Sequence, residues 1–310
     1  MTTKWTAEDI PDQTGTTIVI TGANSGLGLR SAQALAAKGA HVVMACRNAE
    51  KAARALGEVK AVATSAEPEV IALDLADLSS VRDVTAELNE RFDSIDVLLN
   101  NAGIMAVPHG RTADGFESQI GTNHLGHFAL TGLVLPTLLA ASRPRVVNVS
   151  SGGHRMGTIH PDDLNYEERR YTRWGAYGQT KLANLLFTGE LQRRAKAAGT
   201  QLLSAAAHPG YAATNLTSGP ATGAPGFFAP VLRTADKLVG QSDVMGALPQ
   251  LYAATMPDVE GDDYWGPDGF AEQRGHPKRV GRSKKARDDD MARRLWETSE
   301  SLTGVVYEWG

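Results

Sequence analysis

The chain has 310 residues, of which 42% are hydrophobic, and carries a formal net charge of -4 with a pI of about 6.1. This length and apolar content suit a globular domain with a sizeable core. The charge gives no electrostatic reason to expect nucleic acid or an anionic membrane surface as the main partner.

Residues 1–15 form an expected N-terminal extension that has charged side chains and lacks the apolar segment of a signal peptide. No window of the sequence reaches 18 consecutive apolar residues, so no transmembrane helix is expected. Cys46 is the single cysteine, which excludes an intrachain disulfide and fits a reducing compartment. Together these features predict a cytoplasmic protein.

From residue 16 onward, short apolar runs alternate with segments of helical length. The expected strands are residues 17–20, 41–45, 70–73, 95–99, 145–149 and 202–207, and the expected helices are 27–38, 50–64, 79–91, 116–141 and 174–198. Strands this short, apolar and β-branched are typical of a sheet that is buried on both faces. The alternation predicts an α/β, Rossmann-type fold, in which a doubly wound parallel sheet lies between helices in three layers. We expect a single domain over residues 1–310.

The first expected strand ends in a glycine-rich turn at residues 21–28 that leads directly into a helix. Glycine permits positive φ values and close approach of the backbone to a ligand. The helix N-terminus offers free N–H groups to a pyrophosphate. We therefore predict a dinucleotide site here, with an ordinary glycine-rich turn as the alternative. The predicted contacts are Gly22, Asn24, Ser25, Gly26, Leu27 and Gly28.

Arg47 follows the second expected strand, where an NAD site usually has an acidic residue that bonds the ribose 2′-hydroxyl. A guanidinium would instead bind a 2′-phosphate through two hydrogen bonds. The sequence therefore predicts NADP(H) as the cofactor, and a solvent-exposed loop cation is the alternative role for Arg47.

Two further strand ends supply candidate cofactor contacts. Asp74 and Leu75 follow the third strand and are expected near the adenine, although Asp74 suits the capping of a turn almost equally well. Asn101, Ala102 and Gly103 follow the fourth strand and are expected near the adenosine ribose. As a bare sequence, that stretch indicates only a turn.

Tyr177 and Lys181 are four residues apart on an expected helix, so their side chains share one face. A free tyrosine has a pKa near 10, and a cation within about 4–6 Å lowers it. Ser151 follows the fifth strand and can hydrogen-bond a substrate oxygen. An isolated Tyr-x-x-x-Lys pattern is usually a surface pair. Here it follows a phosphate loop and a strand that ends in Ser150 and Ser151, which favours an acid/base site.

In their order and spacing these motifs resemble the short-chain dehydrogenase/reductase family, in its single-domain branch. The resemblance covers about residues 16–215 and is nearest to retinol-dehydrogenase-like and protochlorophyllide-reductase-like members, through residues 121–128 and 181–187. It implies hydride transfer between NADP(H) and an alcohol or its ketone or aldehyde. The implied catalytic tetrad is Asn123, Ser151, Tyr177 and Lys181.

The resemblance also implies a role for each of these residues. Tyr177 would be the acid/base, and Lys181 would lower its pKa and hold the nicotinamide ribose. Ser151 would stabilise the developing alkoxide, and Asn123 would bind a water of a proton relay in a distorted helix. The implied contacts to the nicotinamide carboxamide are Pro209, Gly210 and Thr214.

The partners are less narrowly defined. Apolar residues in a substrate loop region, 211–240, suggest a hydrophobic carbonyl or alcohol substrate. Family members often pair through the helices that carry Asn123 and Tyr177, so these helices would be the expected interface of a homodimer or homotetramer. The oligomeric state itself is left open, and a monomer remains an alternative. A catalytically silent NADP(H)-binding regulatory or scaffold protein is the alternative function, although it would be expected to have a broken tetrad.

Two other features carry weaker predictions. No metal site is expected, because His124 and His127 have no third ligand at a convincing spacing. The C-terminal segment, 270–310, has a basic run followed by three aspartates, which indicates a self-balancing solvated surface. A short helix should follow with three side chains facing the body, namely Met291, Leu295 and Leu302.

Overall fold

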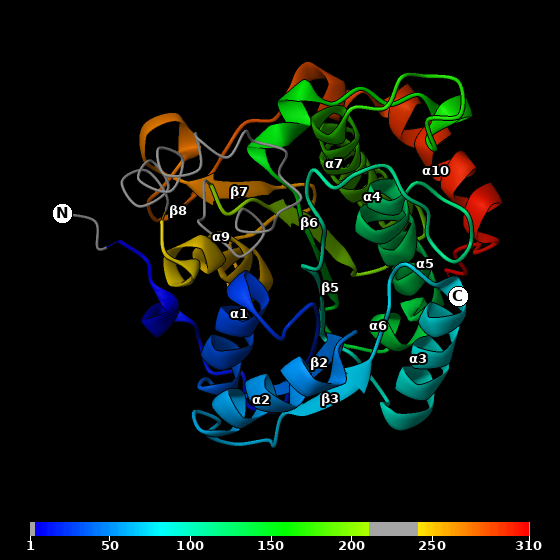
Figure 1. Ribbon diagram of the computed structural model, residues 1–310. Helices are drawn as coiled ribbons and strands as arrows, with labels where there is room; N and C mark the ends of the chain where they lie inside the picture. The colour runs from blue at the N-terminus through cyan, green and yellow to red at the C-terminus, as the bar shows by residue number, and fades with distance from the viewer. Residues whose placement is uncertain (1–3, 211–240, 310) are drawn as a thin grey trace.

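The computed structural model describes residues 4–210 and 241–309, which form a sheet between two layers of helices (Figure 1). The strands are β1 (Thr17–Thr21), β2 (His41–Cys46), β3 (Glu69–Ala72), β4 (Val97–Asn100), β5 (Arg145–Val149), β6 (Leu203–Ala207), β7 (Tyr264–Pro267) and β8 (Pro277–Arg279). Their order is β3-β2-β1-β4-β5-β6-β7-β8, and only β7 and β8 pair antiparallel. The predicted single-domain α/β fold is confirmed. Thr214 and the rest of 211–240 lie outside the described residues.

Each face of the sheet has its own hydrophobic core. Helices α1 (Gly26–Ala36), α2 (Ala49–Lys60) and α9 (Asp243–Thr255) cover one face, and α3 (Leu78–Arg91), α5 (Gly126–Leu133) and α7 (Arg173–Ala197) cover the other (Figure 1). Successive residues of a strand point to opposite faces. Accordingly Ile18 and Ile20 lie in the core beneath α1, and Val19 lies in the core beneath α5. All three side chains are fully buried, as expected of a strand inside a covered parallel sheet.

The prediction of one continuous helix over residues 116–141 is wrong. The segment contains α4 (Ser118–Ile120), a π-helical turn η2 (Gly121–Leu125), α5 and α6 (Leu135–Leu139). Within η2 the Gly126 N–H donates to the carbonyl of Gly121, five residues earlier. Pro136 lacks the N–H that a continuous helix needs, and Val134 leaves helical geometry at φ -94° and ψ 3°. The distortion that the resemblance implied around Asn123 is thus present.

The N-terminal extension packs on the body over its described part. Ile10 is buried, and the Trp5 ring lies 5.0 Å from the ring of Tyr252 in α9. The Trp5 carbonyl accepts a hydrogen bond from Nδ1 of His276, beyond β7. These contacts make residues 4–15 part of the domain.

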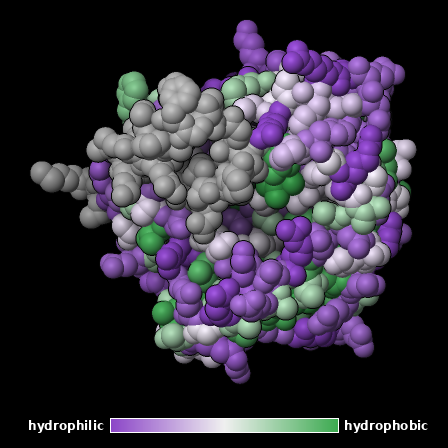
Figure 2. Space-filling view, in the orientation of Figure 1, coloured by the Kyte–Doolittle hydropathy of each residue, from purple (hydrophilic) through white to green (hydrophobic). Residues whose placement is uncertain are grey.

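One face of the molecule is predominantly polar where its residues are described (Figure 2). Figure 2 shows one face on which hydrophilic residues dominate and hydrophobic ones occur in small, separate patches. In the described parts of the chain, no helix combines the length and the apolar character that crossing a membrane requires.

The C-terminal helix α10 (Asp289–Thr303) packs on the outer side of α5 and α7. Leu295 is buried as predicted, and Met291 and Leu302 are half-buried against the core. The main anchor, Trp296, is absent from the prediction. Its ring is fully buried and lies 5.0 Å from Phe128, 5.8 Å from Phe187 and 4.4 Å from Tyr307 between ring centroids, distances typical of favourable aromatic pairs.

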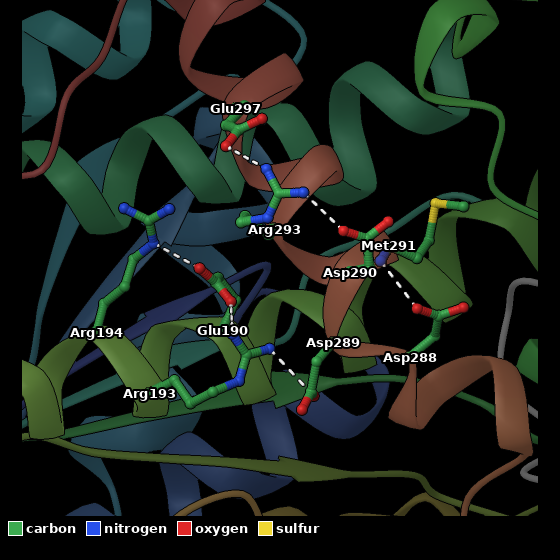
Figure 3. Close-up of polar contacts among 9 residues, drawn as sticks. All are labelled: Glu190, Arg193, Arg194, Asp288, Asp289, Asp290, Met291, Arg293 and Glu297. Atoms are coloured by element: carbon green, nitrogen blue, oxygen red, sulfur yellow. Dashed lines mark hydrogen bonds and ion pairs between the residues drawn. The ribbon is translucent and has the colours of Figure 1, made fainter.

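Charged side chains join α7 to α10, as Figure 3 shows. The buried carboxylate of Glu190 binds the guanidinium groups of Arg193 and Arg194, and Arg193 also lies 3.3 Å from Asp289. Asp288 caps α10 by accepting from the Met291 N–H at 3.0 Å. The basic run and the three aspartates are mostly exposed, as predicted, and the aspartates also cap α10 and tie it to α7.

The position of α10 bears on the implied pairing of subunits. The helices that carry Asn123 and Tyr177 were expected to form the interface between copies. In this chain α10 lies over α7 and over α5, which continues directly from the turn that holds Asn123. Pairing through this face would require α10 to leave it.

We predict that Trp296→Ala lowers the free energy of unfolding by about 3–5 kcal/mol, because it removes a large buried side chain from the contact between α10 and the body. Arg293→Ala removes only exposed ion pairs of the same helix and should change stability by less than about 0.5 kcal/mol. Urea denaturation of both variants measures the difference. Equal effects would contradict the assignment of the Trp296 indole as the main anchor of α10.

Candidate active site

A cleft of about 440 Å³ lies along the carboxyl edge of the parallel strands. The strand order reverses between β1 and β4, and ligands of open α/β sheets bind at such a point. Three strand spacings of about 4.8 Å each separate β2 from β5, so the cleft has two ends about 14 Å apart. The predicted residues that line it are Gly22, Asn24, Ser25, Gly26, Leu27, Gly28, Arg47, Asp74, Leu75, Asn101, Ala102, Gly103, Tyr177, Lys181 and Pro209.

The glycine-rich turn has the backbone geometry that its sequence predicts. Gly22 and Gly26 have φ values of 68° and 51°. A Cβ on Gly28 would overlap the carbonyl oxygen of Gly22 and approach Nδ2 of Asn101 to 2.6 Å, so only glycine allows α1 to start so close to β1 and β4. In the described structure every helix of more than ten residues begins with a side-chain cap except α1, whose Ser25 caps nothing. The first-turn N–H groups of α1 are thus left for an anion.

Thr21 joins the ends of β1 and β4. Its Oγ1 accepts from the N–H groups of Asn101 at 3.0 Å and Ala102 at 2.9 Å. Nδ2 of Asn101 donates to the Thr21 carbonyl at 2.8 Å, and its Oδ1 accepts from Gln250 of α9 at 3.2 Å. Asn101 therefore lines the cleft while its side chain fixes the two central strands.

The β2 end of the cleft carries two cations. Arg47 is 68% exposed, and its Nη1 lies 3.7 Å from Oδ1 of Asp74. Asp74 also accepts from the Ala76 N–H at 3.0 Å, so it does cap a turn. The second cation, Lys51, lines the same end and was not predicted. Asn48, which caps α2, also lines this end and was not predicted either. The position of Lys51, four residues after Arg47, was the signal in the sequence that could have revealed it.

Tyr177 and Lys181 lie at the opposite end, on one face of α7, as their spacing predicts. Both side chains are largely buried. Nζ of Lys181 lies 5.7 Å from the centre of the Tyr177 ring and donates to the Val149 carbonyl at the end of β5, at 2.9 Å. The strand end therefore sets the position of the ammonium group relative to the phenol.

The two serines after β5 have different partners. Ser150 Oγ donates to the carbonyl of Lys181 at 2.7 Å and so ties α7 to the strand. Ser151 Oγ accepts from the Gly153 N–H at 3.1 Å and lies beside Tyr177, where it acts to lower the pKa of the phenol. The second serine, which the sequence singled out, is the one that reaches the phenol.

Burial shifts the pKa values of Tyr177 and Lys181 in opposite directions. It raises the pKa of Tyr177, and the hydrogen bond from Ser151 opposes this only in part. It lowers the pKa of Lys181 from 10.5 to about 8. The lowered tyrosine pKa that the sequence led us to expect is therefore not produced by the protein's own residues.

Asn123 is fully buried in η2, and its side chain is bonded within the protein. Its Oδ1 accepts from the Ile104 N–H at 2.8 Å, and Nδ2 donates to the Ile104 carbonyl at 2.8 Å and to Thr180 Oγ1 at 3.1 Å. Its backbone carbonyl accepts from Nδ1 of His127 at 3.2 Å. Asn123 thus fastens η2 both to the segment after β4 and to α7.

His124 and His127 have structural partners. Nε2 of His124 lies 2.9 Å from Ser299 Oγ in α10, and Nε2 of His127 lies 2.9 Å from Thr21 Oγ1. Burial lowers the pKa of His124 to about 3 and that of His127 to about 4, so both rings are neutral at physiological pH. Within residues 4–210 and 241–309, no group of three or more His, Cys, Asp or Glu side chains is arranged to hold a metal.

The aromatic residues between Ser151 and Tyr177 divide into two groups. Tyr166 and Tyr171 pack on each other, with ring centroids 5.3 Å apart. Trp174 instead lies edge-on to Tyr177, with ring centroids 6.0 Å apart, and is 48% exposed. Of the three, only Trp174 is placed to form a substrate wall.

We predict that Lys181→Met raises the free energy of unfolding by about 1–3 kcal/mol at pH 7, because burial of the ammonium disfavours the folded state. The unfolded chain binds more protons than the folded one between pH 8 and about 10.4, so wild-type stability rises with pH there. The advantage of the variant should therefore shrink from pH 8 to pH 10. Lys196→Met, an exposed position of the same helix, is the control in urea titrations at both pH values. An unchanged or lower stability of Lys181→Met at pH 7 would contradict this account.

Comparisons with known proteins agree with the geometry. The family model described as short chain dehydrogenase matches residues 16–222. Human retinol dehydrogenase 13 is 40% identical over 296 residues, which covers 94% of this chain and 85% of that protein. A solved structure from Mycobacterium paratuberculosis is 48% identical with a TM-score of 0.82, and the match covers 99% of this chain and 100% of that one.

A short-chain dehydrogenase from Shigella flexneri, solved in complex with NADP, shares the fold. Its TM-score is 0.60 at 22% identity, and the match covers 79% of this chain and 93% of that one. The family model covers more than half of the chain, and the human relative is well above the similarity expected by chance. The chain therefore belongs to the short-chain dehydrogenase family and is related to the retinol dehydrogenases.

Proposed function

We propose that the protein is an NADP(H)-dependent oxidoreductase that interconverts an alcohol and its ketone or aldehyde. The observation that carries this proposal is that Tyr177 and Lys181 line one end of a cleft whose middle is the glycine-rich turn, with Ser151 beside the phenol. Membership of the short-chain dehydrogenase family supports it.

The residues that line the cleft fit a dinucleotide. The uncapped start of α1 suits the pyrophosphate, and Arg47 and Lys51 suit a 2′-phosphate at the β2 end. Tyr177 and Lys181 would then face the nicotinamide end. The bound cofactor supplies the hydride, while the protein provides orientation and proton transfer. The NADP in the Shigella flexneri structure supports this choice of cofactor.

Tyr177 is suited to donate a proton when a carbonyl is reduced. Its raised pKa keeps the phenol protonated, and the hydroxyl of Ser151 beside it can bond the same substrate oxygen. For oxidation Tyr177 must accept a proton. Nζ of Lys181 lies 5.7 Å from the centre of the Tyr177 ring, and its positive charge would favour the phenolate. Because burial keeps the pKa of Tyr177 raised in the protein alone, the positive charge of the oxidised nicotinamide would have to add to this effect.

We assign Asn123 to positioning. Protein groups already bond both Oδ1 and Nδ2 of its side chain, and these bonds hold residue 104 and the π-helical turn against α7. A relay water would therefore have as acceptors the remaining lone pairs of Oδ1 and of the backbone carbonyl of Asn123.

We propose a hydrophobic alcohol or carbonyl as the substrate. Trp174 stands beside Tyr177 with half of its surface exposed, and Met156, in the turn that follows Ser151, is 61% exposed. Two large apolar side chains on the segments that flank the phenol favour an apolar ligand. The name of the related retinol dehydrogenases denotes a hydrophobic alcohol.

Tyr177→Phe should bind NADPH normally and lose turnover by about 10²–10⁴-fold, because general acid/base catalysis contributes on this scale. Tyr171→Phe, which loses a hydroxyl bonded to the Val107 carbonyl outside the cleft, is the matched control and should retain activity. NADPH absorbance with a panel of hydrophobic aldehydes and ketones measures both. Near-normal kcat in Tyr177→Phe would refute the acid/base role. A wild-type protein that binds NADPH but turns over no member of the panel would favour the silent binding protein.

Arg47→Asp should lower kcat/KM for NADPH by about 10- to 100-fold relative to NADH, because it removes a charge-assisted bond to the 2′-phosphate and adds a repulsive charge. Lys51→Met should also lower kcat/KM for NADPH relative to NADH, but by a smaller factor. Arg54→Met, on the same helix but outside the cleft, is the control. An unchanged ratio of the two kcat/KM values would show that these cations do not read the phosphate.

A further inference from the structure

A strained turn lies beside the catalytic end of the cleft. Residues 268–276 connect β7 to β8, and within them Ala271 and Glu272 have φ values of 49° and 58°. Non-glycine residues are sterically disfavoured in this left-handed region, and here two of them are consecutive. Such strain persists only where the surroundings enforce it, and it clusters at functional sites.

The carboxylate of Glu272 is held between two cationic or proton-bearing groups. Its Oε2 lies 3.4 Å from Nε2 of His208 and 3.4 Å from Nη2 of Arg155. These groups, His208 first, keep the pKa of Glu272 below its usual value, so the carboxylate is ionised at neutral pH. Glu272 thus contacts two separate segments of the active site from the strained turn.

His208 directs its free nitrogen at this carboxylate. The side chain is 2% exposed, and its Nδ1 accepts from the Gly210 N–H at 3.2 Å, so the ring proton of the neutral histidine is on Nε2. Within the described residues Nε2 has no hydrogen bond of good geometry, and the carboxylate of Glu272, 3.4 Å away, is the acceptor nearest to forming one. Because a buried donor without any acceptor costs free energy, moving the carboxylate further away would be unfavourable.

The turn at residues 268–276 also lies in close contact with the residues that follow His208. Gly210 has a φ of 67°, and a Cβ on it would overlap the carbonyl oxygen of Gln273. The side chain of Gln241 adds a second connection: Nε2 donates to the Pro209 carbonyl, and Oε1 accepts from the Gly275 N–H at 3.1 Å. Pro209 lines the cleft together with Tyr177 and Lys181.

Arg155 connects the same carboxylate to the other side of the site. It belongs to the 3-10 turn η3 (Gly152–Met156), which is capped by the hydroxyl of Ser151. Glu272 therefore bridges the turn that begins at Ser151 and the strand end that leads into Pro209. These segments border the catalytic end of the cleft and come from the ends of β5 and β6.

We propose that Glu272 is a positioning residue that, through His208 and Arg155, fixes Pro209 relative to Ser151 and Tyr177 and so orients the nicotinamide end of the cofactor. This inference rests on the proposed function, because it assumes that the cleft binds NADP(H). It assigns a role in the reaction to a residue that touches neither substrate nor cofactor.

Two ligands and one control variant test the inference. NADPH spans the whole cleft, whereas adenosine 2′,5′-bisphosphate carries the adenosine and 2′-phosphate without the nicotinamide. Glu272→Gln should raise the dissociation constant of NADPH about 5- to 10-fold and lower kcat. The dissociation constant of the bisphosphate should stay within about twofold of the wild-type value. Arg155→Met should show the same selectivity to a smaller extent. Glu260→Gln, an exposed glutamate paired with Arg279 near the same edge of the sheet, should change neither dissociation constant.

Isothermal titration calorimetry of the full chain gives both constants. Equal weakening of the two ligands would show a general loss of structure and overturn the inference, as would unchanged NADPH binding in both variants. A wild-type protein that binds neither ligand would refute the proposed function, and the inference with it. Selective loss for NADPH supports the inference.

Discussion

The chemistry that we propose for this protein depends on a cation held inside its body. Lys181 is buried, and its ammonium donates to the Val149 carbonyl at the end of a central strand. Desolvation penalises the charged form, as the depressed lysine pKa records. The same burial keeps the charge unscreened near Tyr177, where its effect on the phenol is larger than it would be in water. Burial of the Lys181 ammonium thus lowers the stability of the fold and, at the same place, strengthens the effect of its charge on Tyr177.

Much of the fold was predictable because strands covered on both faces leave short apolar runs in the sequence, as residues 145–149 do. The breaks in the segment from 116 to 141 were not, because they depend on tertiary contacts: a Cβ on Gly126 would overlap the Leu75 carbonyl oxygen. Helix α9 was missed because it contains Pro249, which normally argues against a helix.

The site divides in the same way. Residues at strand ends and the helical pair Tyr177 and Lys181 were predictable, because the carboxyl ends of parallel strands meet at one edge and spacing four sets a common helical face. The contribution of Glu272 was hidden, because it depends on contacts with Arg155 and His208, far away in the sequence. The direction of the Tyr177 pKa shift was also hidden, because burial can be judged only once the fold is known.

The position of α10 has a consequence for how the catalytic helix is supported. The indole of Trp296 and the rings around it support α7 from within the same polypeptide. Support that comes from another subunit weakens on dilution by mass action, whereas intramolecular support does not. The arrangement of Tyr177 and Lys181 against β5 is therefore backed by a contact whose strength is independent of protein concentration.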